Sequence, residues 1–139
     1  MFYAIPAPPA IVIQDDLGGV LADYAIQAGR WKAARQAVAI NGTCASACTL
    51  YLATPNACVS TSAIVKLHAP FDNRNGHAVA WARDMMMQAY PAPLRRWIRQ
   101  HGGLTADILT LEGRELTAMF PTCTTATAAL PAPVSHERS

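Results

Sequence analysis

The residue types in this chain that could do chemistry are concentrated between positions 40 and 70. Ser46 stands between Ala45 and Ala47, four residues after Gly42. Such small neighbours allow a turn from a strand into a helix to hold a serine hydroxyl exposed, where bulky side chains would clash. The spacing predicts that Ser46 is a nucleophile. The alternative is a helix N-cap, a position that serine also favours.

A histidine follows the next strand-like run. His68 lies between Val-Lys-Leu and Ala-Pro, 22 residues after Ser46. A histidine at the end of a neighbouring strand can take the proton of a serine hydroxyl as general base. The two residues together predict nucleophilic hydrolysis. The competing interpretation of His68 is a polar residue that closes a strand beside a proline.

The elements that must position these residues are short and alternate in type. Apolar runs predict strands over 10–14, 37–40 and 63–67, with turns at 15–19 and 72–76. Helical spacing predicts helices over 20–28, 46–53, 77–90, 94–100 and 105–111. Strands alternating with helices indicate an α/β fold with a mostly parallel sheet and flanking helices. Gly18-Gly19, Ser46 and His68 each follow a predicted strand, so we expect them at one edge of the sheet, where ligands bind in such folds.

Length and composition limit the class of protein. The 139 residues are 52% hydrophobic and 14% charged, which predicts one folded domain over 11–123, between an extended segment over 1–10 and a flexible tail over 124–139. A net charge of +2 is too small for a nucleic-acid groove. No run approaches the roughly 18 apolar residues of a membrane span. Few charges, many alanines and the run Met85-Met86-Met87 favour a homo-oligomer.

The N-terminus carries no signal-peptide pattern. It lacks a basic region, and Pro6, Pro8 and Pro9 interrupt any apolar helix. The expected location is therefore cytoplasmic, or periplasmic if a leader precedes this sequence.

The order strand, Gly-Gly, helix, strand, Gly-x-x-x-Ser, helix, strand, His-x-Pro resembles the ClpP/crotonase superfamily. It is most similar to bacterial ClpP-like serine proteases that carry a Cys-Ala-Ser-Ala-Cys box, and the resemblance covers roughly residues 11–120. It differs at Leu17 and Asp16, where the family usually has proline and serine. The family's first strand–helix unit is missing or reduced to residues 1–10.

The resemblance implies a role for each matched residue. Ser46 would be the nucleophile and His68 the general base, while the N–H groups of Gly19 and Ala47 would form the oxyanion hole. The third member of the triad would be Glu115, in the step Arg114-Glu115; Glu112 and Asp107 remain open alternatives. No cofactor and no metal are implied.

The predicted function is a serine peptidase with a Ser-His-acid site that acts on a peptide or protein. One alternative is a catalytically inactive ClpP-like binding or assembly module. Another is a crotonase-like acyl-CoA enzyme, which is disfavoured because those enzymes need no serine at the position of Ser46.

The four cysteines allow two disulfides, four buried thiols or a zinc site. Zinc is disfavoured because only Cys44 and Cys48 are close in sequence and no histidine lies at finger spacing. A short turn at Pro55-Asn56 would bring Cys48 and Cys58 within the ~5.5 Å of a disulfide. That bridge would close a loop of about ten residues and contribute about 2–3 kcal/mol. Cys44 and Cys123 would form the second pair.

Overall fold

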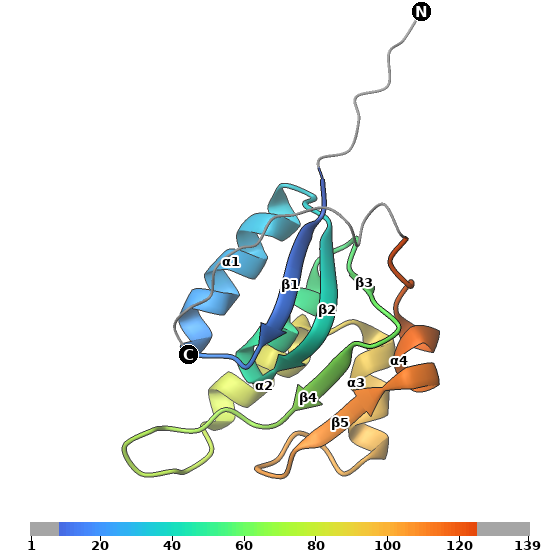
Figure 1. The fold of residues 1–139 in the computed structure, drawn as a ribbon. Helices are drawn as coiled ribbons and strands as arrows, with labels where there is room; N and C mark the ends of the chain where they lie inside the picture. The colour runs from blue at the N-terminus through green and yellow to red at the C-terminus, as the bar shows by residue number, and fades with distance from the viewer. Residues whose placement is uncertain (1–8, 125–139) are drawn as a thin grey trace, which may run out of the picture.

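One mixed β-sheet forms the centre of the structure, a computed structural model that describes residues 9–124 (Figure 1). Its strands are β1 (Ile11–Asp16), β2 (Val38–Ala45), β3 (Cys58–Val59), β4 (Ile64–Leu67) and β5 (Leu109–Glu112). β1, β3 and β4 each pair in parallel with β2, and β5 pairs antiparallel with β4. The fold is therefore α/β with a mixed sheet, in agreement with the α/β class predicted from the sequence.

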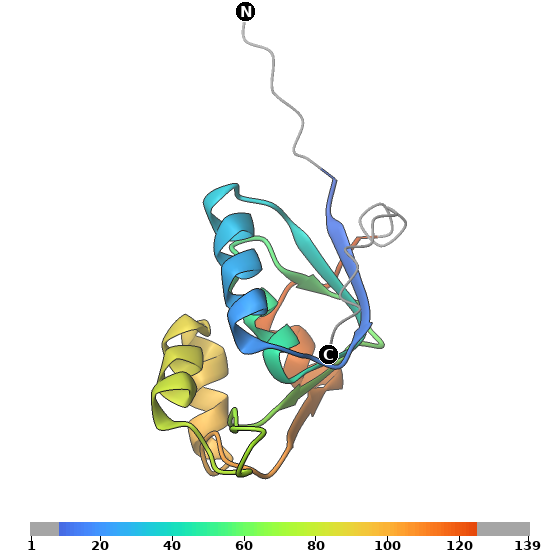
Figure 2. The same ribbon diagram turned by 90° about the vertical axis from the view of Figure 1, so that its left-hand side faces the viewer.

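The described residues also contain five helices. They are α1 (Leu21–Ala33), the 3-10 helix η1 (Ser46–Ala53), α2 (Ala80–Ala89), α3 (Ala92–Gln100) and α4 (Gly113–Met119). In Figure 2, helices α1, α2 and α3 lie on the same side of the sheet. The segments that follow the carboxyl ends of β1, β2 and β4 lead into helices, and these segments carry the predicted site residues.

Tyr51 anchors the packing between α1 and η1. The buried residues of α1 are Tyr24 and Trp31, two helical turns apart, so both face the same way. Their rings lie 5.4 Å and 4.8 Å from the ring of Tyr51, which is fully buried. Burial is the largest cause that raises the pKa of Tyr51, so its hydroxyl stays protonated at neutral pH. This aromatic cluster fixes η1, and with it Ser46, against the first helix.

The strand β5 replaces a predicted helix. The sequence predicts a helix over 105–111, and this prediction is wrong because residues 109–112 form an edge strand beside β4. Leu109 and Leu111 alternate with the exposed Thr110, which is the period of a strand with one apolar face. Leu111 is fully buried opposite Val65. Completing the sheet beside β4 thus outweighed the local helical propensity.

Several predicted boundaries shift in the structure. The second strand continues to Ala45, and α1 runs past Gly29 to Ala33 because Trp31 lies in the core. α2 begins at Ala80 rather than at residue 77, since Ala78 forms a bridge with Phe71 instead. The segments predicted over 1–10 and 124–139 lie outside the described residues, apart from positions 9, 10 and 124.

The structure contains two disulfides, as expected, but both predicted pairings are wrong: Cys48 does not pair with Cys58, nor Cys44 with Cys123. Cys44 is bonded to Cys48, with their Cα atoms 5.4 Å apart, and Cys58 is bonded to Cys123, with a Cα separation of 5.0 Å.

The reason for the pairing is the extent of β2 and β3. Because β2 continues to Ala45, Cys44 ends a strand and Cys48 lies in the first turn of η1 directly after it. Cys58 begins β3, and the chain after α4 returns beside this strand, where the Cys123 N–H donates to the Val59 carbonyl at 2.9 Å. Each disulfide therefore joins a cysteine at the end of a strand to a cysteine in the segment that the fold places beside it.

Candidate functional site

Four of the five predicted site residues line one pocket. It has a volume of about 540 Å³, and Gly19, Ser46, Ala47 and His68 are among its lining residues. These residues follow the carboxyl ends of β1, β2 and β4, which are neighbours in the sheet. The parallel arrangement of these strands therefore brings together residues that are up to 49 positions apart in the sequence.

Ser46 is the first residue of η1 and has an unusual backbone conformation. Its φ is +58°, in the left-handed region that non-glycine residues rarely adopt. The N-cap of η1 is Ala45, so the alternative interpretation of Ser46 as an N-cap is wrong. The Ser46 hydroxyl makes no hydrogen bond with any residue in the described range, His68 included. It is therefore free to meet a substrate in the pocket.

The β1–α1 turn approaches the back of Ser46 very closely. A Cβ atom on Gly18 would lie 2.7 Å from the Ser46 Cβ, and Gly18 has a φ of +95°. The buried Asp16 holds the turn, because its Oδ1 accepts the Gly18 N–H at 2.9 Å and the Tyr24 hydroxyl at 2.8 Å. Asp16 thus fixes a turn in which only glycine fits beside the serine.

The two predicted oxyanion donors remain available. The Gly18 N–H is occupied by Asp16, whereas the Gly19 N–H has no acceptor among residues 9–124. Ala47 is the second residue of η1, and the first N–H groups of a helix lack partners within the helix. Both N–H groups belong to residues that line the pocket with Ser46. They are suitable donors for the negative oxygen of an acyl-transfer intermediate.

Replacing Gly18 by alanine is expected to disturb Ser46 directly. The added methyl group would collide with the Ser46 Cβ and would force an L side chain to keep a φ of +95°. We expect labelling of Ser46 by a fluorophosphonate probe to slow at least tenfold, and the free energy of unfolding to fall by about 1–3 kcal/mol.

The matched control for Gly18 is Gly29→Ala. Gly29 lies in α1 with nothing within 4 Å of an added Cβ, so this variant should gain up to about 1 kcal/mol of stability and keep its labelling rate. Equal labelling rates in the two variants would show that the close packing of Gly18 against Ser46 does not affect the reactivity of the serine.

Two buried hydroxyl groups form a hydrogen-bonded chain that ends at the carbonyl of Ser46. The Thr49 hydroxyl donates to the Ser46 carbonyl at 2.6 Å and, at the same distance, accepts from the Tyr90 hydroxyl. Thr49 and Tyr90 are almost fully buried. Burial is the main cause that raises the pKa of Tyr90, so its hydroxyl stays protonated and able to donate. The end of α2 is thereby linked to the turn that carries Ser46.

His68 follows directly after β4 and is half-buried in the pocket wall. Its Nδ1 lies 2.9 Å from the Ala69 carbonyl. If Nδ1 carries the proton and donates to this carbonyl, Nε2 keeps the lone pair that a general base requires. The Ala69 N–H donates in turn to the Thr105 carbonyl at 2.6 Å. The backbone around the histidine is thus tied to the segment that precedes β5.

Glu115 is not brought to His68. It is exposed on α4, where its Oε2 accepts the Trp97 Nε1–H at 3.0 Å. In the antiparallel register Leu109 lies beside Leu67, and Glu112 lies beside Ile64. Four residues of strand span about 13 Å, so Glu112 and the helix after it are at the end of β4 opposite to His68.

Asp107 lies at the same end of the sheet as His68. It precedes β5 by two residues, and its neighbours Ala106 and Ile108 line a pocket of about 260 Å³ together with His68 and Ala69. Among the three carboxylates considered from the sequence, Asp107 is the one whose backbone lies at the same end of the sheet as His68, and its exposed side chain lines neither pocket that contains His68.

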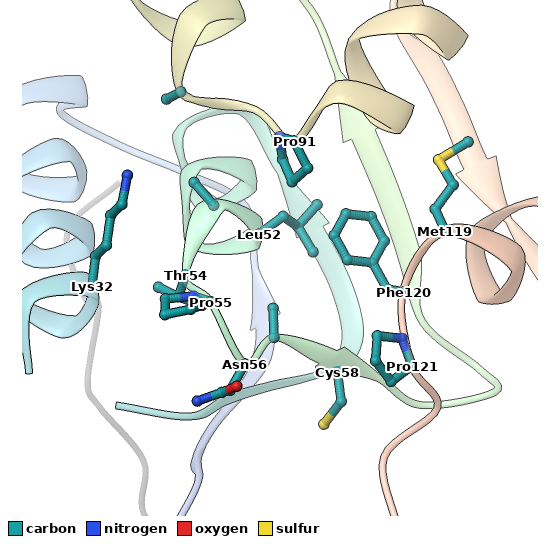
Figure 3. A pocket seen from close by; sticks show the side chains of 13 residues that line it. Lys32, Leu52, Thr54, Pro55, Asn56, Cys58, Pro91, Met119, Phe120 and Pro121 are labelled. Carbon is teal, nitrogen blue, oxygen red and sulfur yellow. The ribbon is translucent and has the colours of Figure 1, made fainter. Parts of the chain in front are cut away.

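A second large pocket lies at the opposite end of the sheet, near the start of β3 (Figure 3). It has a volume of about 590 Å³ and a mainly apolar wall that includes Leu52, Pro91, Phe120 and Pro121. Among residues 9–124, Lys32 is the only charged residue that lines it, and no serine, histidine or carboxylate of this range does so. The larger pocket therefore lacks the groups that hydrolysis needs, while the pocket at Ser46 has them.

Residues 9–124 contain neither a metal-binding cluster nor a membrane-spanning helix. No group of three or more histidine, cysteine, aspartate or glutamate side chains there could hold a metal ion. None of the helices in this part of the chain has the length and apolar character needed to cross a membrane.

Comparison of the chain with protein-family models, with curated proteins and with solved structures found no match.

Sequence reasoning did not find the residues that support Ser46. An aspartate two positions before a glycine is a known signal of a side-chain-stabilised turn, so Asp16 could have been recognised. Thr49 lies one helical turn after Ser46, and its spacing permits the observed hydrogen bond. Nothing in the sequence indicates that Tyr90, 41 residues later, completes this chain of hydroxyl groups.

Proposed function

We propose that this protein is a serine hydrolase with a ClpP-like fold, and that it cleaves peptide bonds. The observation that carries the proposal is the single pocket lined by Ser46, His68, Gly19 and Ala47. The left-handed conformation of Ser46 supports it, because strained backbone at a non-glycine residue is concentrated at functional sites.

The proposed reaction begins with proton transfer. His68 Nε2 takes the hydroxyl proton of Ser46 as the Oγ attacks the substrate carbonyl. The N–H groups of Gly19 and Ala47 stabilise the negative oxygen of the tetrahedral intermediate, and such donors contribute typically about 3 kcal/mol each. His68 then returns the proton to the leaving amine, and water hydrolyses the acyl-enzyme. In the present structure the Ser46–His68 hydrogen bond is not formed, so it has to form when substrate binds.

The third member of the triad is, in this proposal, Asp107 rather than Glu115. A carboxylate beside His68 would orient the ring and stabilise its charged form during the reaction. Asp107 is exposed, and the Ala69 carbonyl already holds Nδ1, so its contribution is smaller than that of a buried acid.

We expect Asp107→Asn to slow phosphonate labelling of Ser46 by about tenfold, because the imidazolium loses a negative charge near it. Glu115→Gln is the matched control, since its amide oxygen can still accept from Trp97. It should leave the labelling rate unchanged. A slower rate in Glu115→Gln alone would restore Glu115 as the acid.

A peptide substrate is supported by the surroundings of the pocket. Its wall includes the exposed side chains of Leu17, Val20 and Phe71, which can pack against an extended apolar segment. Other large apolar side chains are exposed elsewhere, among them Trp81 and Ile108. They support the further proposal that the protein forms a homo-oligomer, since exposed apolar surface is often covered in assemblies.

The second candidate function is a catalytically inactive ClpP-like binding or assembly module, and the missing Ser46–His68 hydrogen bond favours it. A fluorophosphonate probe decides between the two, because only an activated serine reacts with it. Labelling of the purified protein, together with cleavage of fluorogenic peptides, is the result expected of a peptidase. Turnover of an acyl-CoA thioester without peptide cleavage would instead indicate the crotonase-like alternative. No labelling and no turnover would leave the inactive module.

A further inference from the structure

One disulfide spans the proposed nucleophile. Cys44 and Cys48 are bonded to each other, and Ser46 lies midway between them, two residues from each. Both cysteines are fully buried. The bond therefore joins the end of strand β2 to the first turn of η1, on either side of Ser46.

The bridge encloses the one strained residue of this turn. A strand of four residues spans about 13 Å, whereas the Cα atoms of Cys44 and Cys48 are 5.4 Å apart. The chain reverses between them, and Ser46 is at the apex with a φ of +58°. A non-glycine residue remains in this conformation only when its surroundings hold it there.

The two sides of the turn are each fixed to the rest of the fold. On the strand side, Cys44 pairs with Val65 of β4. On the helix side, Thr49 holds the Ser46 carbonyl and is itself held by Tyr90. The disulfide is the covalent link between these two sides. Without it, the turn has a route to relax toward a negative φ, which would change the direction of the Ser46 side chain in the pocket that it shares with His68.

We propose that the Cys44–Cys48 disulfide is a positioning device that keeps Ser46 in its reactive conformation, so that opening the bond lowers the reactivity of the serine while the fold persists. This inference rests on the proposed function. A dithiol would open the bond by supplying two electrons and two protons: the S–S bond breaks, thiols form at Cys44 and Cys48, and the dithiol becomes its own disulfide.

The second disulfide provides an internal comparison. Cys58 and Cys123 lie outside the pocket at Ser46 and join β3 to the segment after α4. This bond links residues 65 positions apart, whereas Cys44 and Cys48 are four positions apart. Loss of the longer connection should affect mainly stability, and loss of the shorter one mainly the reactivity of Ser46.

The experiment compares the double variants Cys44→Ala/Cys48→Ala and Cys58→Ala/Cys123→Ala. The maximal rate of phosphonate labelling, the apparent affinity for the probe and the Tm are measured for each. In the first variant we expect the maximal rate to fall about tenfold or more, as the population of the strained conformer falls, with the affinity unchanged. Its Tm should fall about half as far as that of the second variant. The second variant should keep the maximal rate at temperatures where it is folded.

A reversible test covers the case in which the first variant fails to fold. In the Cys58→Ala/Cys123→Ala background, a dithiol can open only the Cys44–Cys48 bond. Two titrated thiols should accompany the loss of labelling rate, and reoxidation should restore both the bond and the rate.

Each outcome is decisive. An unchanged maximal rate with two free thiols, or in Cys44→Ala/Cys48→Ala, would overturn the positioning role while leaving the proposed hydrolase intact. Absence of labelling in the unaltered protein would instead overturn the proposed function, and this inference with it.

Discussion

Replacing His68 by alanine is expected to slow the labelling of Ser46 by a fluorophosphonate by about 10²–10⁴-fold, the usual contribution of a general base. Without the imidazole, the serine proton must be lost directly to water. The side chain is half-buried in the pocket wall and its Nδ1 lies beside the Ala69 carbonyl, so the substitution should cost little stability.

The matched control is His101→Ala. The His101 Nδ1–H likewise donates to a backbone carbonyl, that of Trp97, and the His101 ring stacks on the Trp97 ring with centroids 4.0 Å apart. It does not line the pocket at Ser46. This variant should lose a small amount of stability and keep its labelling rate. Equal rates in the two variants would show that His68 is not the base.

The second large effect concerns stability. Removing the Cys58–Cys123 disulfide by alanine substitution is expected to lower the free energy of unfolding by about 4 kcal/mol, because the bond closes a loop with a sequence separation of 65 residues. For a protein of this size the Tm should fall by roughly 10–20 °C.

Calorimetry of the oxidised proteins is the measurement. The comparison variant is Cys44→Ala/Cys48→Ala, for which the same chain-entropy argument gives about 2 kcal/mol. An equal or smaller loss in Cys58→Ala/Cys123→Ala would contradict the greater importance of the long loop. Thiol titration of the denatured, unreduced protein should find no free cysteine, since all four are bonded. Two disulfides are also typical of proteins in oxidising compartments rather than of the reducing cytosol.

The shared pocket of the candidate site could be predicted from the sequence because it depends on parallel strands. Gly19, Ser46 and His68 each follow a strand whose apolar run is plain in the sequence, and parallel neighbours end at the same edge. The placement of the candidate carboxylates could not be predicted in this way. It depends on β5, which runs antiparallel to β4 and so sends Glu112 and Glu115 to the far end of the sheet.

The disulfide pairing was missed for a related reason. It depends on where strands end, and strand ends are poorly encoded in local patterns. Residues 41–45 contain glycine, threonine and small residues rather than an apolar run, yet they continue β2 beside β4. The two-residue strand β3 is too short to give a periodic signal. Both features are set by pairing with distant strands, which the sequence alone does not reveal.

If Ser46 is an activated nucleophile, as proposed, a fluorophosphonate must become attached to this residue. The labelled protein is digested and its peptides are fragmented in a mass spectrometer, in parallel with the variants Ser46→Ala and Ser60→Ala. Ser60 serves as the control because it is a serine elsewhere in the fold, whose hydroxyl lies 3.2 Å from that of Ser62. We expect the phosphonate to be attached to Ser46 in the unaltered protein and in Ser60→Ala. Ser46→Ala should carry none, with its Tm nearly unchanged. Attachment to another serine, or undiminished labelling of Ser46→Ala, would show that Ser46 is not the nucleophile.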